Sequence, residues 1–95
     1  MPYQYPFRYT QESLKREIFY KGNLIANEDS NEWRTDICGA IMQYSKHGNT
    51  NSEYGWEIDH IKPQALKGSD ETYNLQPLNW RNNRKKGDTY PWHCN

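Results

Sequence analysis

The second half of the sequence contains side chains that could together carry out metal-assisted hydrolysis. They are one carboxylate, one imidazole and one carboxamide, namely Asp59, His60 and Asn83. Hydrolysis of a phosphodiester needs a water molecule that loses a proton and a cation where negative charge develops. An imidazole titrates close to neutral pH, so His60 suits the task of general base. The oxygens of Asp59 and Asn83 are the kind of ligand that Mg²⁺ accepts, with water and phosphate completing its coordination.

The segment that carries Asp59 and His60 is predicted to be a strand. Two short runs with strand character cover residues 40–44 and 55–61, and turn-forming residues fill 45–54 between them. The economical interpretation is a β-hairpin with a long loop.

Alternation along this strand separates two kinds of side chain. Trp56, Ile58 and His60 fall on one face, and Glu57 and Asp59 fall on the other. Because the two apolar residues must face the core, Asp59 is expected to project from the opposite side.

Asn83 is predicted to lie on a short helix. Residues 74–76 can form a brief returning strand, after which Pro77 opens a helix over about 79–86 that Gly87 closes. A helix of about two turns does not persist alone in water, so the rest of the domain must hold it in place.

The remaining elements give one small domain over residues 1–95. Residues 1–9 are predicted to be an extended arm, and the spacing of apolar residues after Thr10 predicts a helix over 10–21. The arm, the helix and the first hairpin strand occupy 1–54, and an irregular tail occupies 89–95.

Four segments in order resemble the signature of the HNH endonuclease family. They read Trp56-Glu-Ile-Asp-His-Ile-Lys-Pro63, Gly68-Ser-Asp70, Asn74-Leu-Gln-Pro-Leu78 and Asn83-Arg-Lys-Lys-Gly87. The motif covers about residues 55–88. The lead-in Trp33-Arg-Thr-Asp36 with Cys38-Gly39 also resembles some members, with less specificity.

The resemblance implies an α+β fold of the ββα-metal type and a single-metal endonuclease acting on DNA, with RNA as an alternative substrate. It implies that Asp59 and Asn83 hold the cation and that His60 activates water. It assigns Asn74 a bracing role, in which its side chain bonds across the 61–73 loop and fixes the backbone around His60.

The chain departs from the family pattern in its ligands. Many members carry two CxxC pairs that bind zinc, but Asn79 and Asn82 stand at positions of one such pair. Some relatives have a histidine ligand where Asn79 stands. Asn79 is therefore a candidate third ligand or only the helix N-cap, and its presence favours Mg²⁺ or Mn²⁺ over Zn²⁺ or Ni²⁺.

The charge is balanced overall, with 12 basic and 12 acidic residues, but it is unevenly placed. A basic cluster on the predicted helix, together with one arginine upstream, is expected to contact the nucleic-acid backbone. These residues are Arg34, Arg81, Arg84, Lys85 and Lys86.

Other interpretations remain open from the sequence. The same scaffold could bind nucleic acid with little or no catalysis, or the chain could be a structural protein. A zinc site from Cys38, His47, His93 and Cys94 and a glycosidase pair of Glu53 and Glu57 can be drawn, but neither has suitable spacing or context.

The sequence also gives expectations about compartment. It shows no apolar run that resembles a signal peptide or a membrane span. Cys38 and Cys94 could form one disulfide, but nothing else indicates a disulfide framework, so a reducing cytoplasm is the default expectation. The oligomeric state is not indicated.

Overall fold

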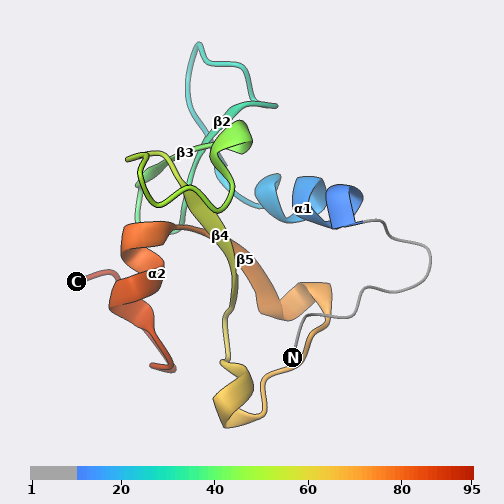
Figure 1. Ribbon diagram of the computed structural model, residues 1–95, viewed down its shortest axis with the longest axis vertical. Helices are drawn as coiled ribbons and strands as arrows, with labels where there is room; N and C mark the ends of the chain where they lie inside the picture. Colours follow the sequence, from blue (N-terminus) through green and yellow to red (C-terminus); the bar gives the residue numbers. More distant parts are fainter. Residues whose placement is uncertain (1–10) are drawn as a thin grey trace.

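The computed structural model describes residues 11–95, so the predicted arm over 1–9 and the helix start at Thr10 lie outside the described residues. Two small antiparallel sheets and two α-helices make up the fold (Figure 1). The first sheet has the order β1-β2-β3, formed by Asn23–Leu24, Trp33–Thr35 and Ile41–Gln43. The second pairs β4 (Trp56–His60) with β5 (Leu75–Asn79).

The N-terminal helix α1 spans Gln11–Phe19 and confirms the predicted helix, although it ends before residue 21. Leu14 and Ile18 lie one turn apart and pack with Leu75 of β5 in one buried cluster. Phe19 packs with Met42 and Trp56 in a second cluster. Large rings and a few aliphatic side chains thus form the core between α1 and the sheets.

The predicted hairpin between 40–44 and 55–61 is wrong. Strand β3 pairs with β2, with Arg34 opposite Met42, and β4 pairs with β5 over five residues. The intervening chain instead folds on itself, beginning with the 3₁₀ helix η1 (Tyr44–Lys46). Only isolated bonds, such as that from the Gln43 N–H to the Tyr54 carbonyl (3.0 Å), link its two ends.

The returning strand β5 is longer than predicted and includes Pro77, which therefore does not open the helix. Pro77 lies opposite Ile58 in the ladder. A proline donates no hydrogen bond, and it is tolerated here because both strands of a two-stranded sheet have an unpaired edge. Helix α2 (Trp80–Lys86) follows directly, with Asn79 as its N-cap, and Gly87 (φ 51°) ends it as predicted.

The alternation predicted for β4 is confirmed, and it gives the strand two roles. Trp56 and Ile58 pack on the core beneath α1. Glu57 and Asp59 point the other way and contact side chains of α2. Figure 1 shows α2 and α1 on different sides of the β4–β5 ribbon. The strand is thus apolar toward one helix and acidic toward the other.

Cys38 and Cys94 form the disulfide that the sequence left open, and it joins chain positions 56 residues apart. The bond fastens the C-terminal tail to the loop between β2 and β3. Disulfides persist mainly in oxidising compartments, so this bond does not favour the cytoplasmic location expected by default. Neither α-helix within residues 11–95 has the length and apolar character needed to cross a bilayer.

Asp36 joins the two sheets and the start of α2. Its carboxylate is 1% exposed. Oδ1 accepts from the backbone N–H groups of Cys38 and Ala40, and Oδ2 accepts from the N–H of Asn79 and the side-chain amide of Asn82, all at 2.9–3.0 Å. A buried carboxylate with four donors is well compensated for the loss of water.

We expect Asp36→Ala to lower the free energy of unfolding by at least about 3 kcal/mol, because several buried donors lose their acceptor. Urea unfolding followed by tryptophan fluorescence measures this change. The matched control is Asp29→Ala, which removes an exposed carboxylate that accepts from the Asn31 N–H (2.9 Å) and should change stability by less than about 1 kcal/mol. Equal effects of the two substitutions would contradict the role of Asp36.

Candidate active site

Asp59, His60 and Asn83 line one cavity of about 470 Å³. Its walls come from the end of β4, the segment 63–65 and helix α2. The side chains predicted to hold a cation and to activate water are thus brought together from a strand and a helix. Asn74 does not line this cavity, and its side chain instead binds the backbone of Lys62, just before the segment 63–65.

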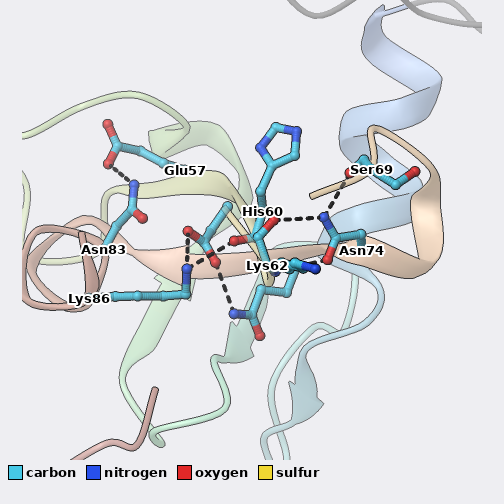
Figure 2. Close-up of polar contacts among 9 residues, drawn as sticks. Glu57, His60, Lys62, Ser69, Asn74, Asn83 and Lys86 are labelled. Atoms are coloured by element: carbon cyan, nitrogen blue, oxygen red, sulfur yellow. Dashed lines mark hydrogen bonds and ion pairs between the residues drawn. The ribbon is translucent and has the colours of Figure 1, made fainter. Parts of the chain in front are cut away.

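The carboxylate of Asp59 is buried and bound at both oxygens. Oδ1 lies 3.2 Å from the ammonium of Lys86, and Oδ2 accepts from the Gln76 side-chain amide at 3.0 Å. The Lys86 ammonium also donates to the backbone carbonyl of His60 at 2.9 Å (Figure 2). The exposed fractions of the Lys86 and Asp59 side chains are 2% and 7%, so this is a buried ion pair.

Asn83 is oriented by Glu57, the other acidic residue on this face of β4. The Asn83 amide nitrogen donates to Glu57 Oε1 at 2.8 Å, and the amide oxygen is turned away from Glu57 (Figure 2). Arg84 donates to the same carboxylate at 2.7 and 3.3 Å. Glu57 therefore holds two consecutive residues of α2.

The ring of His60 is held by Asp70. Nε2 lies 2.8 Å from Asp70 Oδ1, and the same oxygen accepts from the Gln64 side-chain amide at 2.8 Å. The hydrogen bond with His60 is the main cause that lowers the pKa of Asp70; partial desolvation opposes it, and the bond from Gln64 adds to the lowering. An ionised carboxylate only accepts, so Nε2 carries the proton in this pair. Figure 2 shows the ring directed away from Lys86.

Asn74 makes the bonds across the 61–73 loop that the family resemblance implied. Its side-chain oxygen accepts from the Lys62 N–H at 2.9 Å. Its amide nitrogen donates to the carbonyls of Lys62 and Ser69 at 3.0 and 2.7 Å (Figure 2). The backbone of Asn74 also accepts from the Ile61 N–H at 2.7 Å. One 7%-exposed carboxamide thereby closes both ends of the loop that follows His60.

Asn79 is not placed as a third ligand. It is 4% exposed and does not line the cavity. Its side-chain oxygen caps α2 by accepting from the Arg81 N–H, and its amide nitrogen donates to the carbonyls of Ile41 and Glu53. The N-cap interpretation is the one that the structure shows.

The predicted basic contacts divide into two groups. Arg81, Arg84 and Lys85 are exposed on α2. Lys86 is buried and its ammonium pairs with Asp59. From this position the ammonium cannot reach a phosphate. Arg34 lies on β2, where its guanidinium donates to the carbonyls of three residues, Tyr20, Gly22 and Ser30. The predicted contact with the nucleic-acid backbone therefore does not suit Lys86. It does not suit Arg34 either, because the hydrogen bonds of its guanidinium are made within the protein.

Two residues that contact the site, Glu57 and Asp70, were given no role in it from the sequence. Glu57 could have been found, because alternation puts it beside Asp59 on the face that meets the helix. Asp70 belongs to the Gly68-Ser-Asp70 segment of the HNH-like signature, where it is interpreted only as a turn residue. Its contact with His60 depends on how the loop folds back, which no spacing rule predicts.

The structure also decides between the alternative sites. Cys38 and Cys94 are bonded to each other, so they cannot form a zinc site with His47 and His93. Glu57 is bound to Asn83 and Arg84, which does not suit one half of a glycosidase pair.

The donor set at the cavity fits a hard divalent cation. Within residues 11–95 no three or more His, Cys, Asp or Glu side chains cluster to hold a metal. The candidate ligands are one carboxylate and one carboxamide oxygen, a set that leaves most coordination positions to water and phosphate, as Mg²⁺ sites commonly do. The amide oxygen of Asn83, turned from Glu57, supports this fit.

One of three comparisons with known proteins found a match. A family model described as HNH endonuclease matches residues 42–89, about half of the chain. No curated protein matches the chain, and no solved structure matches it. The matched range contains β4, β5, α2 and every residue that lines the cavity.

We expect Lys86→Met to lower the free energy of unfolding by about 3–5 kcal/mol, because it leaves the buried carboxylate of Asp59 without its cation. Lys85→Met, the same change at the exposed neighbouring position, should cost no more than about 0.5 kcal/mol. Adding Asp59→Asn to Lys86→Met should recover part of the loss. Thermal and urea unfolding test these values, and equal losses for the two lysine variants would refute the ion pair.

Proposed function

Because the chain belongs to the HNH endonuclease family, we propose that it is a metal-dependent endonuclease that hydrolyses phosphodiester bonds of DNA by a single-metal mechanism. The observation that carries this proposal is the shared cavity of Asp59, His60 and Asn83. Carboxylate, imidazole and carboxamide are the groups that such a reaction requires, and here the end of strand β4 supplies the first two and helix α2 supplies the third.

Each residue of the site has a distinct task in this mechanism. His60 takes a proton from the attacking water, and Asp70 holds its ring through Nε2. Asp59 and Asn83 would hold the cation through oxygen atoms. A bound divalent cation supplies positive charge at the scissile phosphate and stabilises the developing negative charge. Asn74 fixes the loop after His60 through its bonds to Lys62 and Ser69.

The expected metal is Mg²⁺ or Mn²⁺. Both proposed ligands are oxygens, and Asn79, the position at which a nitrogen ligand would favour Zn²⁺ or Ni²⁺, is engaged as the helix cap. Lys86 keeps Asp59 fixed by a bond to one of its oxygens. Each carboxylate oxygen has two lone pairs, so this contact does not consume the acceptor capacity of Asp59.

A second candidate function is nucleic-acid binding with weak or no cleavage. The observation in its favour is the ammonium of Lys86, which lies 3.2 Å from Asp59 Oδ1. This ammonium neutralises the carboxylate that is proposed to hold the cation, and thereby weakens its attraction for a metal. The two functions make opposite predictions for metal-dependent cleavage.

We expect the protein to nick supercoiled plasmid DNA with Mg²⁺ or Mn²⁺ and to lose this activity in EDTA. His60→Ala should lower the cleavage rate by about 10²–10⁴-fold while DNA binding is retained, because it removes the general base. Ni²⁺ and Zn²⁺ are run in parallel, and a structured RNA replaces the plasmid in a further arm. Binding without cleavage under every metal would refute the enzyme and support the binding function.

Exposed cations of α2 should set the salt dependence of DNA binding. We expect Arg81→Ala and Lys85→Ala each to weaken binding and to reduce the slope of log K against log salt by about one, as loss of a phosphate contact does. Arg34→Ala is the control, because its guanidinium already binds backbone carbonyls, and its slope should equal that of the wild type. Fluorescence anisotropy of a labelled duplex measures the slopes. If Arg34→Ala alone reduced the slope, the phosphate contacts would lie on β2 and not on α2.

A further inference from the structure

Glu57 lies two residues before Asp59 on β4, so both side chains face α2. Its Oε1 accepts from Asn83 Nδ2 at 2.8 Å and from Arg84 Nη1 at 2.7 Å. Its side chain is 24% exposed, and Glu57 itself does not line the cavity that Asn83 lines. A residue outside the cavity thus holds a proposed ligand inside it.

The chemistry of the two groups restricts how Asn83 can be oriented. A carboxamide has a donating nitrogen end and an accepting oxygen end, and a half-turn about its terminal bond exchanges them. An ionised carboxylate only accepts hydrogen bonds, so Glu57 can bind only the nitrogen end. The oxygen end is then turned away from Glu57 (Figure 2). Without this carboxylate the nitrogen could take the place of the oxygen, and an amide nitrogen does not ligate a cation.

We propose that Glu57 is a positioning residue that selects the orientation of the Asn83 carboxamide and thereby sets the affinity of the site for a divalent cation. The inference rests on the proposed function, since it assigns Asn83 to the metal. Residues that orient metal ligands through hydrogen bonds typically change metal affinity by about 10–100-fold when they are removed.

Arg84 offers a competing explanation, because it shares the carboxylate of Glu57. Removing Glu57 also releases a guanidinium near the site, and its positive charge could repel a cation. Arg84→Ala separates the two effects, since it leaves the bond between Glu57 and Asn83 in place. Under our proposal Arg84→Ala keeps the metal affinity of the wild type within about threefold, whereas repulsion predicts the recovery of affinity in Glu57→Ala/Arg84→Ala.

The test is Mn²⁺ binding by the full chain without DNA, measured from the electron paramagnetic resonance signal of free Mn²⁺. We expect Glu57→Ala to bind Mn²⁺ about 10–100-fold more weakly than the wild type. Glu57→Gln should show a smaller loss, because glutamine has the same size but can bind either end of Asn83. Glu28→Gln, an exposed glutamate on the loop between β1 and β2, is the matched control and should bind as the wild type does.

A double-mutant cycle with Asn83→Ala identifies the route of the effect. If Glu57 acts through Asn83, Glu57→Ala causes no further loss of Mn²⁺ affinity in the Asn83→Ala background. An equal loss in both backgrounds would mean that Glu57 ligates the cation itself or acts through its charge, and would overturn the proposal.

The outcomes for the two proposals are distinguishable. A wild type that binds no Mn²⁺ and nicks no DNA overturns the proposed function and this inference together. A wild type that binds Mn²⁺ and nicks DNA, with Glu57→Ala binding equally well, overturns this inference alone. Thermal unfolding is recorded for every variant, and Glu57→Gln carries the test if Glu57→Ala does not fold.

Discussion

Helix α2 has seven residues, too few to be stable in water by itself, so the candidate site depends on what holds this helix. Three carboxylates hold it at successive points. Asp36 accepts from the first turn, Glu57 accepts from Asn83 and Arg84 in the middle, and Asp59 pairs with Lys86 at the end. The sign of the arrangement suits the helix dipole, because an anion lies near the N-terminus and cations fill the last turn.

These contacts tie the stability of the helix to the geometry of the site. Asp59 is both a proposed ligand and the partner that fixes the last turn of α2. Glu57 is both an anchor for α2 and the group that orients Asn83. If the proposed roles hold, a substitution at either position changes folding and cation binding together, so loss of cleavage alone does not assign a role. Stability and metal affinity have to be measured separately for each variant.

The sequence predicted the local features of the fold better than the pairing of distant segments. The helix near Leu14, the cap at Asn79 and the two faces of β4 follow from spacing and residue type, which act over a few neighbours. The pairing partner of β4 does not follow from such local rules. Two runs with strand character on either side of a turn-rich loop have the same sequence pattern whether or not they pair with each other. The choice of β5 depends on a five-residue ladder that includes Pro77, which sequence rules treat as a strand breaker.

The charges of the candidate site show why a protein with no net charge can suit an anionic substrate. Both carboxylates on this face of β4 are neutralised from α2, Asp59 by Lys86 and Glu57 by Arg84. These ion pairs reduce the negative charge that the two carboxylates bring to the site before a cation enters, while Asp88 also lines the cavity. A divalent cation held by Asp59 and Asn83 would then make the site positive where the phosphate binds. Among the ion pairs of residues 11–95, Arg81 and Lys85 of α2 have no carboxylate partner, and both are exposed. They are therefore better placed than Lys86 to contact the nucleic-acid backbone.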